Sequence, residues 1–185
     1  MSTLATNRVI DKEAFERTID AFKRFEVENG QLVEVEPMGN LQSTVVVNLS
    51  YFLLQHLGGP PCYQLFESEA RFRLKKNPDL IRGADLSYVP AERIPAGGPD
   101  SKVGDYIPAL VVEVISDSNP GERIVSKTDE WFEAGASLLW IVYPMAKVVY
   151  VYSDPNSCRI LRKGDNLDGG TVLPGLQIPL DRIFK

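Results

Sequence analysis

One acidic residue inside an apolar strand constrains the fold of this chain more than any other feature. The segment from Ile107 to Ser116 is β-branched and apolar on both faces, with Glu113 near its centre. Such runs are typical of strands that are covered above and below. An unpaired carboxylate there would cost on the order of several kcal/mol in desolvation. Glu113 must therefore find a cation, a hydrogen-bond network or a proton, unless it lies at an exposed edge of the sheet.

A helix is predicted directly after this strand, over residues 121–135. Asn119, Pro120 and Glu122 have the order of an N-cap, a proline at the first helical position and a capping-box glutamate, and Gly135 fits the C-terminal stop. The apolar stripe expected to face the core consists of Ile124, Val125, Thr128, Trp131 and Phe132. Lys127 falls at the border of this stripe. It can aim its ammonium at the carboxyl end of the Glu113 strand or extend into solvent.

A second acid precedes the apolar strand. Residues 82–89 read as a short strand that begins near Asp85, 28 positions before Glu113. Two converging carboxylates suit a hard divalent cation such as Mg²⁺, which takes oxygen ligands and keeps several waters. A nearby ammonium, here that of Lys127, can stabilise negative charge that develops on a phosphoryl group. Acids and lysines are frequent, so the spacing alone leaves structural roles open for all three residues.

Three segments of the chain carry a family pattern: RGADLSYVPAERIP, PALVVEVISDSNPGERIVSKTDEWFEAGASLLWIVYP and VLPGLQIPL. They resemble a bacterial family of putative restriction endonucleases, a branch of the PD-(D/E)XK nuclease superfamily. The resemblance implies a restriction-endonuclease-like core and a Mg²⁺-dependent DNA endonuclease, with Mn²⁺ as a substitute, in which a metal-activated water hydrolyses a phosphodiester bond. It assigns the catalytic roles to Asp85, Glu113 and Lys127, and the metal to Asp85, Glu113 and the main-chain oxygen of Val114.

The chain also departs from the family pattern. Ala84 stands where the family commonly has proline, and Ile115 stands two positions after Glu113, where the superfamily usually has its lysine. The helical Lys127 is therefore the best candidate for the missing cation. Ser43 falls near a position where many relatives have a histidine. The two literal Pro-Asp pairs, 78–79 and 99–100, lie in stretches that read as loops and are not expected to form the site.

The rest of the chain predicts one α+β (α/β) domain spanning residues 1–185, with a mixed β-sheet flanked by helices. Two further helices are expected at about 12–23 and 41–57, and a hairpin around Asn29 and Gly30. Other strands are expected near 64–65, 70–74, 138–142, 147–152 and 173–178.

Composition predicts a cytoplasmic protein without a membrane segment. The sequence contains no 18-residue apolar run, and its N-terminus leads into a charged helix rather than a signal peptide. Cys62 and Cys158 lack metal-motif spacing and are expected to be free buried thiols. His56 is the only histidine, which excludes a histidine-rich metal site.

The charge balance opposes a nucleic-acid partner, because the net charge is −5 and such proteins usually carry a basic footprint. A local exception exists at Arg71, Arg73 and Lys75, which alternate along one predicted strand, with Arg82 nearby. These four cations could bind DNA phosphates. It is an equally good interpretation that these charges keep an exposed edge strand from pairing with another chain.

Three functions stay open on the sequence. The first is a Mg²⁺-dependent DNA endonuclease, the second a catalytically silent binding or assembly module that keeps the nuclease fold, and the third a metal-dependent nuclease that acts on RNA. Because restriction-like enzymes commonly act as dimers, the resemblance also implies a homo-oligomer, a dimer or higher.

Overall fold

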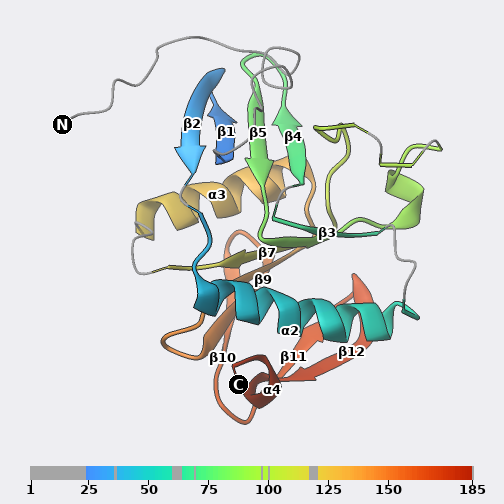
Figure 1. Cartoon of the computed structure of the whole chain (residues 1–185), viewed down its shortest axis with the longest axis vertical. Coiled ribbons are helices and arrows are strands. Elements are labelled where there is room, and N and C mark those ends of the chain that lie inside the picture. The colour runs from blue at the N-terminus through green and yellow to red at the C-terminus, as the bar shows by residue number, and fades with distance from the viewer. Residues whose placement is uncertain are drawn as a thin grey trace.

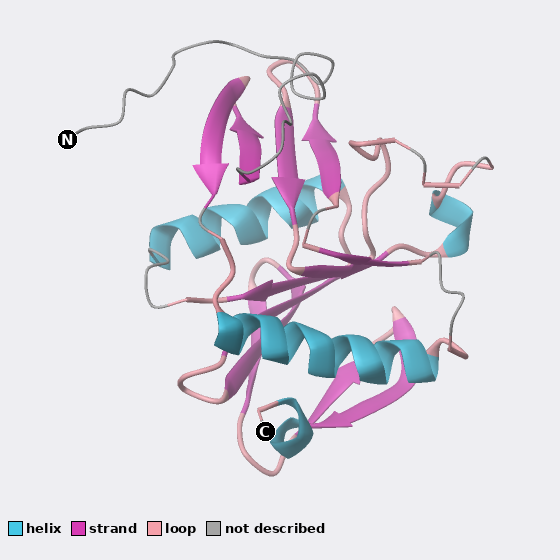
Figure 2. Cartoon of the chain, viewed as in Figure 1, coloured by secondary structure: helices cyan, strands magenta, loops and turns pink. Residues whose placement is uncertain are grey.

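The computed structural model describes residues 24–35, 37–59, 64–68, 70–96, 98–99, 101–116 and 121–184. The helix predicted at 12–23, the predicted cap residues Asn119 and Pro120, and Cys62 lie outside these ranges. Within them the chain forms three sheets and several helices, shown in Figures 1 and 2.

A small antiparallel sheet of four strands has the order β2-β1-β5-β4. Its strands are β1 (Arg24–Glu28), β2 (Gln31–Val35), β4 (Arg71–Lys75) and β5 (Leu80–Gly83). The predicted hairpin is confirmed: Glu28 pairs with Gln31, and Asn29 and Gly30 between them have φ values of 50° and 71°. Glycine and asparagine adopt this left-handed conformation at little steric cost.

A six-stranded sheet forms the centre of the molecule, in the order β10-β9-β8-β7-β6-β3. Its strands are β3 (Leu65–Glu67), β6 (Leu86–Tyr88), β7 (Leu110–Val114), β8 (Leu138–Tyr143), β9 (Val148–Asp154) and β10 (Ser157–Leu161). Strands β7 and β8 run parallel, and the other neighbours in this sheet run antiparallel. The predicted mixed sheet is therefore confirmed.

Two helices flank this sheet on opposite faces. Helix α2 (Asn40–His56) buries Val45, Val46, Leu49 and Leu53 against the β7 residues Leu110, Val112 and Val114. Helix α3 (Gly121–Ala134) packs Trp131 against the other face, which includes Val111 and Leu139. Figure 1 shows α3 between the central sheet and the small sheet, whereas α2 lies on the far side. Strand β7 is thus covered on both faces, as its apolar pattern predicts.

The C-terminal part adds a two-stranded sheet of β11 (Asn166–Gly169) and β12 (Leu173–Pro179), followed by the short helix α4 (Leu180–Ile183). Its buried side chains Leu167, Leu176 and Ile178 join the core beneath α2. A short 3₁₀ helix at Ala91–Arg93 follows β6.

Several expectations need correction. Strand β7 ends at Val114, so Glu113 lies at its carboxyl end rather than near its centre. Val125 on α3 is 63% exposed, because it lies about 100° around the helix from Ile124 and away from the sheet. Cys158 is a free thiol but is exposed, since it lies on the edge strand β10. The strand expected at 173–178 pairs with β11 in a sheet of its own.

Candidate active site

Asp85 and Glu113 meet at the boundary between the small four-stranded sheet and the central six-stranded sheet. Asp85 lies between β5 and β6, and Glu113 lies at the end of β7. The backbone N–H of Val114 donates to Asp85 Oδ2 at 2.7 Å, and the N–H of Asp85 donates to the carbonyl of Val112 at 3.1 Å. These two hydrogen bonds hold Asp85 beside Glu113. Both carboxylates line one cavity of about 150 Å³.

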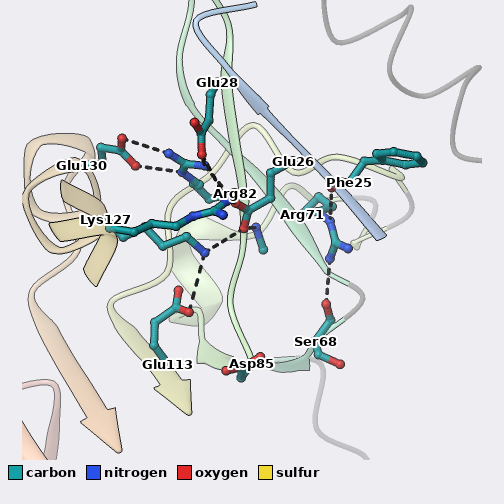
Figure 3. Close-up of polar contacts among 12 residues, drawn as sticks. Phe25, Glu26, Glu28, Ser68, Arg71, Arg82, Asp85, Glu113, Lys127 and Glu130 are labelled. Atoms are coloured by element: carbon teal, nitrogen blue, oxygen red, sulfur yellow. Dashed lines mark hydrogen bonds and ion pairs between the residues drawn. The ribbon is translucent and has the colours of Figure 1, made fainter. Parts of the chain in front are cut away.

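Lys127 enters the same cavity from α3. Its Nζ lies 3.8 Å from Glu113 Oε2, and its side chain is only 15% exposed. Figure 3 shows the ammonium between Glu113 and a second glutamate, Glu26. Of the two positions considered for this lysine, the structure therefore has the inward one. The three predicted catalytic side chains line one site, together with Ile115 and the predicted metal-ligand residue Val114.

Glu113 keeps a high proton affinity in this setting. Burial raises its pKa, Lys127 opposes this, and the charges of Asp85 and Glu26 add to the rise, so that the pKa is about 7. Trp131 Nε1 donates to Glu113 Oε1 at 3.3 Å and orients the carboxyl group. A divalent cation would relieve the repulsion between these acids.

The donor set fits Mg²⁺ or Mn²⁺ better than a softer metal. Asp85 and Glu113 supply carboxylate oxygens, which hard cations prefer, and the cavity has room for water molecules as further ligands. The side chains that soft metals favour, histidine and cysteine, do not line it. Across the part of the chain that the structure describes, no three His, Cys, Asp or Glu side chains gather as a metal cage. Two carboxylates with several waters is the arrangement typical of Mg²⁺.

Glu26 was not predicted from the sequence, yet it has the best-defined contacts in the site. It lies on β1 and is 2% exposed. Its Oε1 accepts from Lys127 Nζ at 3.0 Å, and its Oε2 accepts from Arg82 Nη1 at 2.8 Å. Burial acts to raise the pKa of Glu26, but Lys127 and Arg82 together lower it. The residue is therefore an anion that bridges two cations.

Arg82, on β5, forms the centre of an ion-pair cluster between the small sheet and α3. Its guanidinium is 3% exposed and contacts Glu26, Glu28 and Glu130. Burial acts to lower the pKa of Arg82, but the hydrogen bond to Glu130 and the charge of Glu26 outweigh it and raise the pKa. Arg123 on α3 adds weaker contacts to Glu26 and Glu28. Arg82 is thus engaged within the protein, which does not favour it as a phosphate contact.

The cations on β4 do not form the exposed row that the sequence predicted. Arg71 is 7% exposed and donates to the carbonyls of Phe25 and Ser68. Arg73 pairs with Asp79, and a register shift separates it from the exposed Lys75. The three side chains therefore do not form a continuous solvated stripe, because β4 is an edge strand whose arginines fold back onto the protein. Arg71 alone of the three lines the cavity.

The remaining sequence features lie away from the carboxylates or at the rim. Asp79 lies in the turn between β4 and β5, as expected for a Pro-Asp pair outside the site. On α2 the cavity is lined by Gln42 rather than Ser43. His56 ends α2.

Comparison with known proteins now assigns the family. The chain matches the Uma2 family, described as "Putative restriction endonuclease", over residues 13–181. The chain belongs to this family. Its structure is also similar to the crystal structure of a putative nuclease of the DUF820 group from Anabaena variabilis ATCC 29413, with a TM-score of 0.79 and 15% sequence identity. That match covers 93% of this chain and 96% of the other and shows that the two share a fold.

No curated protein matches the chain. Among the helices in the described ranges, none combines the length and apolar character needed to cross a membrane. The Uma2 membership and the shared fold agree with the restriction-endonuclease-like core implied by the sequence.

Proposed function

We propose that this Uma2 protein is a Mg²⁺-dependent DNA endonuclease. The observation that carries the proposal is the convergence of Asp85, Glu113 and Lys127 on one cavity, with the lysine ammonium 3.8 Å from the Glu113 carboxylate. Two acids and one cation are the charges that phosphodiester hydrolysis needs, since the acids hold a metal and the cation offsets charge on the phosphoryl oxygens.

Each residue of the candidate site has a distinct part in the proposed reaction. Asp85 and Glu113 would hold the ion, with the main-chain oxygen of Val114 as a further ligand. A bound Mg²⁺ would supply Lewis-acid activation of water and neutralisation of phosphoryl charge. The Lys127 ammonium would orient the attacking water and donate to a phosphoryl oxygen. Ile115 lines the cavity, and Trp131 lines a smaller one that also includes Glu113 and Lys127; the two side chains would limit competing solvent at the reacting group.

A cleavage assay tests the proposal. Supercoiled plasmid and a matched single-stranded RNA are incubated with the protein in Mg²⁺, in Mn²⁺ and in chelator. We expect metal-dependent cleavage of DNA by the wild type and none by a protein with Asp85→Asn and Glu113→Gln. Asp79→Asn is the matched control, because it removes a carboxylate from a literal Pro-Asp pair outside the site and should leave cleavage intact.

The outcomes separate the three candidate functions. Preference for the RNA substrate would replace DNA by RNA as the target. A folded wild type that cleaves neither and is not stabilised by metal would leave the silent binding module as the function. Equal cleavage by wild type and the double variant would move the active site elsewhere.

The role of Lys127 has its own test. Lys127→Ala should lower turnover by roughly a hundredfold, a size expected for loss of one transition-state donor, while metal affinity stays nearly unchanged. Adding Ile115→Lys to this variant should restore part of the activity, because Ile115, directly after β7, lines the same cavity. Full activity of Lys127→Ala would assign the catalytic cation to another residue.

A further inference from the structure

We propose that Glu26 is the positioning residue of the active site, which fixes the Lys127 ammonium over the two acidic residues. The proposal rests on the proposed nuclease function and adds a residue that does not belong to the predicted set. Glu26 would not touch the phosphodiester or the metal; it would act through Lys127.

The contact distances support this role. Lys127 Nζ lies 3.0 Å from Glu26 Oε1 but 3.8 Å from Glu113 Oε2. The closer partner of the candidate catalytic lysine is therefore Glu26. Figure 3 shows the ammonium drawn between the two carboxylates, with Asp85 on the Glu113 side. A lysine held from one side in this way keeps donor capacity for a group on the other side.

Glu26 is itself rigidly held. Arg82 Nη1 donates to its Oε2 at 2.8 Å, and the backbone N–H of Gly83 donates to its Oε1 at 3.3 Å. Arg82 is anchored in turn by Glu130 at 2.8 Å. The chain of contacts thus runs from α3 through the small sheet and back to Lys127 on α3. Supporting hydrogen bonds of this kind hold a catalytic side chain in its productive geometry.

The location of the lysine explains why such a support is needed. A lysine at position 115, directly after β7, would be placed by backbone whose N–H is hydrogen-bonded to Val142 on β8. Lys127 instead reaches the cavity from a helix through a flexible four-carbon stem. A metal held by Asp85 and Glu113 would also compete for the negative charge of Glu113. Glu26 would then be the anion that keeps Lys127 in place.

A double-mutant cycle tests the proposal through activity. Glu26→Gln should lower kcat by about tenfold, with KM nearly unchanged, because the amide cannot hold the ammonium as an ion pair. In a Lys127→Ala background the same change should have no further effect, since Glu26 acts only through Lys127. Glu28→Gln is the matched control: Glu28 contacts Arg82 and Arg123 but is not in contact with Lys127, so kcat should stay within about twofold of wild type.

A second readout does not depend on activity. Side-chain NMR relaxation at the Lys127 ¹³Cε group, measured without metal, should show a clear fall in order parameter in Glu26→Gln and none in Glu28→Gln. If Glu26→Gln fails to fold, Glu26→Asp keeps the charge for Arg82 but shortens the side chain by one methylene, and should give the same changes in reduced size.

The results decide between positioning and a merely structural role. Unchanged Lys127 mobility, or a loss of kcat that adds in full to that of Lys127→Ala, would overturn the proposal. A folded wild type that cleaves neither DNA nor RNA would overturn the nuclease function and with it the catalytic part of the proposal. The NMR measurement would in that case still decide whether Glu26 fixes Lys127.

Discussion

Two clusters of buried charge lie side by side next to α3, and their charges are balanced differently. In the Arg82 cluster, one guanidinium contacts three carboxylates, Glu26, Glu28 and Glu130. In the acidic pair, Glu113 contacts the ammonium of Lys127 at 3.8 Å, but that ammonium lies closer to Glu26, at 3.0 Å. The pKa of Glu26 is lowered, whereas that of Glu113 is raised to about 7. The charges around Arg82 compensate one another, whereas the raised pKa of Glu113 is what the Mg²⁺ ion proposed above would relieve.

The largest expected effect comes from removing the centre of the compensated cluster. Arg82→Met should reduce the free energy of unfolding by about 3–5 kcal/mol, because it leaves three carboxylates without their shared cation. Urea denaturation measures this loss. Arg123→Met is the control, since Arg123 contacts two of the same glutamates but is 36% exposed; it should cost under about 1 kcal/mol. Equal losses for the two variants would contradict a special role of burial at Arg82.

Removing a charge from the acidic pair should raise the free energy of unfolding, whereas removing the charge of Arg82 should lower it. In the folded protein the pKa of Glu113 is about 7, against 4.5 for an ordinary glutamate, so the folded state binds this proton more tightly. The wild type should therefore lose stability as the pH rises from about 4.5 to 7, by an amount on the order of 3 kcal/mol.

Glu113→Gln removes this pH dependence. In chelator at pH 8 the variant should be more stable than the wild type by on the order of 3 kcal/mol, and near pH 4 the difference should be small. Urea unfolding of both proteins across this range provides the measurement. Parallel stability curves would show that Glu113 does not titrate differently in the folded state.

Metal binding should offset the loss of folding stability caused by repulsion within the acidic pair. At a Mg²⁺ concentration of 100 times Kd, binding should raise the free energy of unfolding of the wild type by about 2.7 kcal/mol. Glu113→Gln and Asp85→Asn should lose this gain, as followed by Tm with and without the ion. Asp79→Asn, which alters a carboxylate paired with Arg73, should keep the gain. Retention of the gain by all three variants would place the ion at other residues.

The smallest effect is expected at an exposed ion pair. Arg159 and Asp168 are 2.8 Å apart, but the arginine side chain is 56% exposed. Arg159→Ala should change the free energy of unfolding by less than about 1 kcal/mol. A loss comparable with that of Arg82→Met would show that contact distance, rather than burial, decides the strength of these pairs.

Local patterns pointed to the acids and the lysine of the candidate site, and the family resemblance assigned their roles. The apolar run around Glu113 identified β7, and the periodicity after Gly121 identified α3 with Lys127 at the border of its buried face. These signals work because a covered strand and an amphipathic helix each impose a repeating pattern on neighbouring residues. Short strands such as β5 and β10 lack such a pattern and were not predicted.

Glu26 shows the limit of this reasoning. In the sequence it alternates with Phe25 and Val27, which is the usual pattern of a strand with one solvent-facing side. In the structure, however, that side faces α3 and is buried by Lys127 and Arg82. The alternation predicted the strand correctly but gave no sign of what would cover its polar face.

The sequence by itself therefore determined which segments form the main helices and strands, and that one of those strands carries a buried acid requiring a partner. These are consequences of local periodicity and of the cost of burying a charge. The tertiary structure alone decided which partners the buried charges have. The packing of the small sheet against α3 brings Glu26 to Lys127 and withdraws Arg82 from solvent, because contacts between segments distant in the chain depend on how whole elements pack.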